Sequence, residues 1–273
     1  MSGAPPFAEL IAATNYSFLR GASHPAEMVW QAHALGMAGI GIADRNTVAG
    51  VVKAHIAWRD LGGMESGLRL AVGARLVFAP DPQTGMTTPD VIAYPATRHG
   101  WGRLTRLLTL GNRRATKGDC TLYLSDLVAH AQDLLLIVTR PDEDVLQRLS
   151  SACPGAVWLA VSMLRAGADA RRLEEVRALS ARTGVPLLAS NDALFAAPDA
   201  RTLHDVITCI REGVTIHAAG KRLAANAERH LKPPAEMARL FAGCPEALGA
   251  TGDLLSRIAF TLDDLRYEYP HEP

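Results

Sequence analysis

The sequence lacks the features by which several classes of protein are recognised. Its nine histidines never occur as HxH, HxxH or HxxxH, so the usual local anchor of a zinc or iron site is missing. Its four cysteines lie far apart without a CxxC pair, which is typical of reduced thiols in the cytosol. The apolar runs are too short to span a bilayer, and the N-terminus does not have the pattern of a signal peptide. These absences favour a soluble, cytoplasmic protein without membrane contact.

The chain also lacks an excess of either charge. Of its 273 residues, 28 are lysine or arginine and 28 are aspartate or glutamate, which gives a formal net charge of zero. A free-standing nucleic-acid-binding protein is usually basic, so any DNA contact would need a local patch. The stretch from Trp101 to Lys117 offers one, with Arg103, Arg106, Arg113, Arg114 and Lys117 as its positive residues. These residues could contact phosphate or a partner, or they could form an ordinary solvated helix face.

Short apolar segments of strand length recur along the chain and alternate with segments of helical pattern. The strand candidates are Met37–Ala43, Leu70–Phe78, Val91–Tyr94, Leu134–Thr139, Val157–Val161 and Val185–Ser190. Helices are predicted between several of them, for example between Ser23 and Gly36 and over Ala170–Thr183. The alternation predicts an α/β fold with a largely parallel sheet, and the number of units favours a closed barrel.

The sequence pattern changes after Lys221. Two short helical patterns lie near Glu236–Phe241 and Pro245–Ile258, and they lead into the tail Leu262–Pro270. We therefore divide the chain into a barrel domain, residues 1–225, and a helical connector, residues 226–273, that leads out of the domain.

Three stretches resemble the motifs of the PHP domain found in bacterial C-family DNA polymerases. Thr14–Ser23 (TNYSFLRGAS) is similar to the first motif, Ile42–Asn46 (IADRN) to the Thr-Asp-His motif, and Leu188–Phe195 (LASNDALF) to the motif that closes the metal site. The segment Tyr16–Leu19 and the tail Leu262–Pro270 resemble the error-prone, damage-inducible branch, a relative of the DNA polymerase III alpha subunit.

This resemblance implies both a fold and a parent protein. The fold would be a distorted (β/α)7 PHP barrel related to TIM barrels, with a C-terminal helical connector. The parent chain would be a DNA-directed DNA polymerase used in damage-induced mutagenesis and translesion synthesis. Its implied partners are the polymerase module of the same chain, primer-template DNA through that module, and mutasome or sliding-clamp proteins.

The resemblance also locates the positions that form the PHP metal site, and most of them cannot bind a metal here. These vestigial positions are Ile11, Ala13, Arg20, Arg45, Arg75, Asp90, Asp192 and Leu194. Metal-assisted phosphoester hydrolysis requires a cluster of anionic or imidazole ligands. We therefore expect a degenerate metal site, no catalytic residue and no cofactor in this segment. The alternative is a metal-dependent phosphoesterase or proofreading 3′–5′ exonuclease with an unusual site.

Arginine occupies three of the vestigial positions, which suggests a replacement for the metal charge. A guanidinium is permanently charged and can bridge carboxylates bidentately. We expect Asp192 to pair with Arg20, Arg45 or Arg75 at the mouth of the barrel, where the carboxyl ends of parallel strands meet. Drift to solvated surface arginines is the alternative hypothesis.

Overall fold

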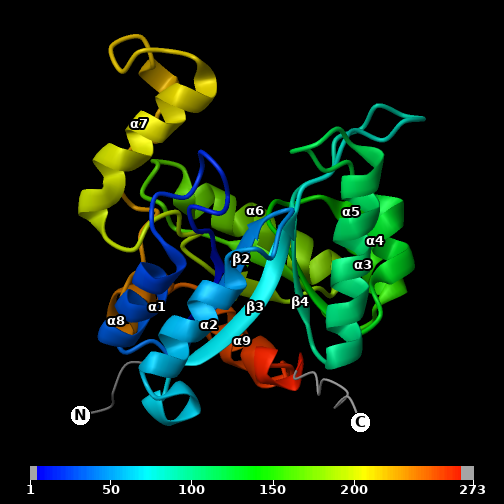
Figure 1. The fold of residues 1–273 in the computed structure, drawn as a ribbon, viewed down its shortest axis with the longest axis horizontal. Helices are drawn as coiled ribbons and strands as arrows, with labels where there is room; N and C mark the ends of the chain where they lie inside the picture. The colour runs from blue at the N-terminus through cyan, green and yellow to red at the C-terminus, as the bar shows by residue number, and fades with distance from the viewer. Residues whose placement is uncertain (1–4, 266–273) are drawn as a thin grey trace, which may run out of the picture.

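The computed structural model describes residues 5–265, which form a seven-stranded sheet with helices around it (Figure 1). The strands are β1 (Ala8–Ala12), β2 (Gly39–Arg45), β3 (Arg69–Leu76), β4 (Val91–Pro95), β5 (Leu134–Val138), β6 (Val157–Val161) and β7 (Leu187–Ala189). The helices are α1 (Pro25–Ala34), α2 (Val51–Asp60), α3 (Arg98–Arg114), α4 (Leu124–His130), α5 (Glu143–Ala152), α6 (Asp169–Thr183), α7 (Arg201–Glu212), α8 (Pro234–Leu240) and α9 (Pro245–Ser256). The predicted α/β barrel class is confirmed. Strand β1 is not among the sequence predictions, because Glu9 interrupts its short apolar run.

The sheet is mixed, and the strand order follows the sequence. β1, β2 and β3 are parallel to one another, as are β5, β6 and β7, whereas β4 is antiparallel to both of its neighbours. Antiparallel neighbours need no helical crossover, and residues 77–90 join β3 to β4 without a helix. As a result, the start of β4 lies at the same end of the barrel as the carboxyl ends of the other strands.

The barrel is nearly closed between β1 and β7. Just past both strand ends, the Ala13 N–H donates to the carbonyl of Ala193 at 2.9 Å. At the opposite end, α9 packs against both strands, and the Thr251 hydroxyl accepts the N–H of Ala8 at 3.2 Å. Helix α9 therefore covers the seam at which the sheet meets itself.

The predicted connector packs on the barrel. Helices α8 and α9 and the turn between them contribute apolar side chains to the same buried cluster as the strands, including Met237, Phe241, Leu248 and Leu254. In Figure 1, α9 lies below the sheet, and α7 projects from the opposite end. The tail residues from Arg266 to Pro270 lie outside the described part of the chain.

A tyrosine fills the inside of the barrel, and two glycines make room for it. Tyr94 of β4 is fully buried, and its hydroxyl donates to the carbonyl of Leu10 at 2.9 Å. A Cβ at Gly41 would lie 2.2 Å from that hydroxyl oxygen, and one at Gly73 would lie 2.6 Å from the ring. The absence of a side chain at Gly41 of β2 thus allows the Tyr94 ring to pack inside the barrel.

Among residues 5–265, no helix is long and apolar enough to cross a membrane.

Candidate functional site at the barrel mouth

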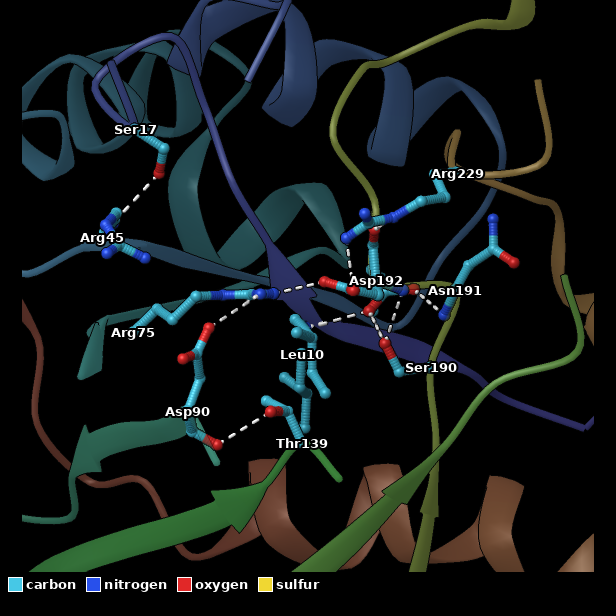
Figure 2. Close-up of polar contacts among 12 residues, drawn as sticks. Leu10, Ser17, Arg45, Arg75, Asp90, Thr139, Ser190, Asn191, Asp192 and Arg229 are labelled. Atoms are coloured by element: carbon cyan, nitrogen blue, oxygen red, sulfur yellow. Dashed lines mark hydrogen bonds and ion pairs between the residues drawn. The ribbon is translucent and has the colours of Figure 1, made fainter. Parts of the chain in front are cut away.

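The barrel mouth brings an arginine between two carboxylates. Arg75 lies at the end of β3, Asp90 directly precedes the antiparallel β4, and Asp192 follows β7. One terminal nitrogen of Arg75 lies 3.6 Å from Asp90 Oδ2, and the other is hydrogen-bonded to Asp192 Oδ1. Figure 2 shows the guanidinium bridging the two acids. The pairing of Asp192 with an arginine from the vestigial positions is therefore confirmed for Arg75.

A second arginine, absent from the sequence prediction, completes the cluster. Arg229 lies between α7 and α8, and its Nη2 is hydrogen-bonded to Asp192 Oδ2. Its Nε also donates to the backbone carbonyl of Asp192 at 2.9 Å. Each carboxylate oxygen of Asp192 thus has its own guanidinium partner (Figure 2). Arg229 is 37 residues from Asp192 and belongs to no local motif, so the sequence carried no signal for it.

The cluster is largely shielded from water, and its charges stabilise one another. The Arg75 side chain is 15% exposed, and those of Asp192 and Arg229 are each 27% exposed. Burial alone would raise the pKa of Asp192, but the guanidinium groups of Arg229 and Arg75 outweigh it and hold the pKa below its usual value. Burial opposes the charge on Arg75, but the Asp192 and Asp90 carboxylates raise its pKa. At Arg229, burial outweighs the Asp192 carboxylate and lowers the pKa of the guanidinium. The charged forms of Asp192 and Arg75 are therefore the ones that the cluster favours.

Hydrogen bonds that lead through Ser190 to a buried carboxylate hold Asp192 in an unusual backbone conformation. Asp192 has a φ of 46°, in the left-handed region that aspartate and asparagine tolerate best among residues with a side chain. Its N–H donates to Ser190 Oγ at 2.8 Å, and that hydroxyl donates to Glu9 Oε1 at 2.6 Å. Glu9 also accepts the N–H groups of Asn191 at 2.6 Å and Ile11 at 2.9 Å. Glu9 of β1 therefore ties the β7 end to β1 beneath the arginine cluster.

Glu9 is fully buried, and burial raises its pKa against the effect of its hydrogen bonds. Glu9 is not among the site residues predicted from the sequence. A lone carboxylate within the apolar segment Phe7–Ala13 is nevertheless a visible signal, because a buried acid needs several donors.

The residues at this mouth do not fit the metal centre that a PHP fold implies. Ile11, Ala13 and Leu194 are buried apolar side chains, and Ala13 and Leu194 pack together against Phe195. The space between the acids Asp90 and Asp192 is filled by a guanidinium. Among residues 5–265, no group of three or more histidine, cysteine, aspartate or glutamate side chains is arranged to hold a metal ion.

Arg20 and Arg45 do not join the cluster, so Arg75 is the one of the three candidate arginines that pairs with Asp192. Within the described part of the chain, neither has a carboxylate oxygen within 4.0 Å of its guanidinium. In Figure 2, Arg45 lies on the other side of Arg75 from Asp192, and its backbone N–H donates to Ser17 Oγ at 3.0 Å. Ser17 Oγ in turn donates to buried Asp44 at 2.7 Å, which fixes the loop after β1 to the end of β2.

The basic stretch of α3 and the loop after it does not form one patch. Arg114 makes two hydrogen bonds to Asp126, at 2.5 and 2.9 Å, and Arg103 donates to Gln132 at 2.7 Å. Arg106 and Arg113 are exposed. Lys117 instead lines a separate pocket that it shares with Arg20 and Arg45. Contact of these five residues with phosphate or a partner stays a prediction.

Comparison with known proteins shows the family to which this chain is similar. Residues 10–169 match the PHP domain family. An error-prone DNA polymerase of Brucella abortus is 50% identical over 98% of this chain, and one of Rhodopseudomonas palustris is 46% identical over the same share. These matches cover 25% and 24% of the relatives, so the chain spans about a quarter of their length.

A solved structure shares the fold at low sequence identity. A protein from Bifidobacterium adolescentis, assigned as a metal-dependent phosphoesterase, superposes with a TM-score of 0.50 at 15% identity. The match covers 70% of this chain and 88% of that protein. The chain thus belongs to the PHP domain family, and nearly its whole length is similar to the N-terminal PHP region of bacterial error-prone DNA polymerases.

Proposed function

We propose that this chain is a non-catalytic PHP module that braces an error-prone DNA polymerase and mediates its contacts. The parent protein would be a DNA-directed DNA polymerase, a nucleotidyltransferase, that acts in DNA repair, damage-induced mutagenesis and translesion synthesis. Similarity to error-prone polymerases over 98% of the chain supports this parentage. The segment by itself would neither polymerise nucleotides nor hydrolyse phosphoesters.

The observation that carries the proposal is the Arg75 guanidinium between Asp90 and Asp192. PHP hydrolysis uses metal ions to lower the pKa of a bound water and to neutralise phosphate oxygens. A guanidinium supplies positive charge, but it cannot generate a metal-bound hydroxide. A metal ion entering between these acids would also separate Arg75 from its partners in a shielded place, which is costly.

The alternative is a metal-dependent phosphoesterase or a proofreading 3′–5′ exonuclease with an unusual site. The family membership and the fold of the phosphoesterase neighbour support it. The residue types at the mouth oppose this alternative, because the apolar side chains of Ile11, Ala13 and Leu194 cannot bind a metal ion.

The first prediction separates these two functions. We expect the purified chain to show no chelator-sensitive hydrolysis of bis(p-nitrophenyl) phosphate or of the 3′ end of labelled single-stranded DNA, with Mn²⁺ or Zn²⁺ added. Elemental analysis after dialysis should find less than one ion per chain. Hydrolysis that is abolished both by chelator and by Asp192→Asn would instead establish the phosphoesterase or exonuclease.

An exposed apolar face on α7 supports the interaction role. Leu203, Val206 and Ile210 recur at helical spacing, and their residues are 52%, 46% and 61% exposed. Helix α7 projects away from the barrel, as Figure 1 shows. Because the curated relatives are about four times as long as this chain, we propose that this face packs on the polymerase module of the same protein.

The second prediction tests this face. In this test the chain and a polymerase region from a Brucella relative are two separate proteins, and interferometry measures their affinity. The double change Leu203→Ser and Ile210→Ser should weaken that affinity at least tenfold. The thermal midpoint of the chain should stay within about 2 °C, because both side chains are exposed. Val52→Ser with Ile56→Ser, at 57% and 54% exposure on α2, is the matched control and should leave association unchanged. Equal losses in both variants would contradict the assignment to α7.

Further contacts belong to the same proposal. The parent enzyme would reach primer-template DNA through its polymerase module and could assemble with mutasome or sliding-clamp proteins. Its location would be the cytoplasm, and this segment would carry no cofactor.

A further inference from the structure

A basic pocket lies beside the arginine cluster, with a volume of about 860 Å³. Its positive side chains come from distant parts of the chain and are Arg20, Arg45, Lys117 and Arg211. Arg20 follows β1, Arg45 ends β2, Lys117 follows α3, and Arg211 lies in the last turn of α7. The tertiary structure therefore gathers charges that are unrelated in sequence.

These charges are poorly compensated by acids. Among the described residues that line the pocket, Asp119 is the single carboxylate. Arg211 bonds Glu212 at 3.0 Å and the carbonyl of Leu19 at 2.8 Å, whereas Arg20 and Arg45 have no acid within 4.0 Å in residues 5–265. The pKa of Arg20 is lowered, first by burial and then by the nearby guanidinium groups of Arg45 and Arg211. Such a field attracts an anion that brings several negative charges.

The wall of the same pocket also carries aromatic rings. Phe18 is 79% exposed, and Tyr16 is half-buried beside it. An exposed phenylalanine beside three guanidinium groups matches a ligand with a planar ring next to phosphate. Single-stranded nucleic acid has both features, since its bases stack on aromatic side chains and its backbone follows positive charge.

We propose that this pocket binds a short segment of single-stranded nucleic acid. The phosphates would be held by Arg20, Arg45 and Arg211, and a base would stack on Phe18. This inference goes beyond the proposed function, because it depends on the pocket and not on the loss of hydrolysis. It also differs from contact along α3, where Arg103 and Arg114 already bond protein groups.

The test is fluorescence anisotropy of the whole chain with a labelled oligothymidylate of twelve nucleotides over a series of salt concentrations. Arg20→Gln with Arg45→Gln should weaken binding at least tenfold. It should also lower the magnitude of the salt slope, which is the slope of log affinity against log salt concentration, by about 1.4. Each phosphate contact on a single strand contributes about 0.7 to this slope, and the variant loses two arginines. Phe18→Ala should weaken binding about fivefold or more without changing the slope, because stacking releases no counterions.

The matched control is Arg103→Gln with Arg106→Gln, which removes the same charge outside the pocket. Binding by this control should stay within about twofold of the parent. Arg20→Lys with Arg45→Lys should retain most of the salt slope, and this checks that a loss in the glutamine variant is not misfolding. Loss of binding in the α3 control, no saturable binding by the parent, or equal affinity for an acidic peptide of the same length would overturn the proposal. Tighter binding of thymidine triphosphate than of the oligonucleotide would overturn the assignment to a strand.

Discussion

Replacing Asp192 by asparagine should lower the free energy of unfolding by about 2–4 kcal/mol. The change removes the carboxylate shared by Arg75 and Arg229, which leaves Arg75 with Asp90 alone and takes from Arg229 its carboxylate partner in a shielded place. Breaking a fully buried pair costs about 3–5 kcal/mol, and the 27% exposure of Asp192 reduces this figure through solvent screening. Backbone strain does not confound the test, because asparagine also tolerates the φ of 46° at this position.

Urea denaturation of the parent and the variant measures this effect. The control is Glu175→Gln, which breaks the exposed pair with Arg171 and should cost less than about 0.5 kcal/mol. A loss at Asp192 no larger than that of the control would mean that the arginines are solvated and that drift is the better account of the site.

The same pair of proteins gives a pH test with a defined sign. The arginines lower the folded-state pKa of Asp192, so its contribution to stability is present above the unfolded pKa, about 3.9, and is lost as the pH falls through the folded value. The stability difference between the parent and Asp192→Asn should therefore be constant above about pH 5 and shrink below about pH 4. A difference that persists unchanged at the lowest pH at which both proteins fold would point to packing instead of charge.

Replacing Glu9 by alanine should be still more destabilising, by about 3–5 kcal/mol. The change leaves three buried donors without an acceptor, namely the Ile11 and Asn191 N–H groups and the Ser190 hydroxyl. Each unsatisfied buried group costs about 1–3 kcal/mol, and part of the total is recovered because the cost of burying the polar carboxyl group is also removed.

The conservative variant Glu9→Gln separates hydrogen bonding from shape. Its carbonyl oxygen can still accept from Ile11 and Ser190, but its amide would face the Asn191 N–H, donor against donor. We expect a loss of about 1–3 kcal/mol in urea denaturation, with faster hydrogen exchange at Asn191. Glu27→Gln, at the exposed cap of α1, is the control and should change little. Equal stability of Glu9→Ala and the parent would show that Glu9 does not close the barrel.

The sequence by itself predicted the fold class, and it shows apolar residues at positions where the PHP resemblance implies metal ligands. Apolar runs such as Leu134–Thr139 and Val157–Val161 predict buried strands, because burial on both faces removes the polar alternation of an exposed strand. The side chains at Ile11, Ala13 and Leu194 exclude metal ligation wherever they lie, because ligand chemistry belongs to the residue type.

Only the tertiary structure decided which charges meet. The antiparallel direction of β4 places Asp90 beside Arg75 at the mouth, and no pattern in the sequence encodes that direction. Arg229 reaches Asp192 only because the segment between α7 and α8 returns to the mouth. Arg45 and Arg75 both end neighbouring strands, yet one faces an open pocket and the other faces two carboxylates. The pairing of charges depends on side-chain positions set by packing across the whole barrel, whereas burial and ligand capacity are local properties of each residue.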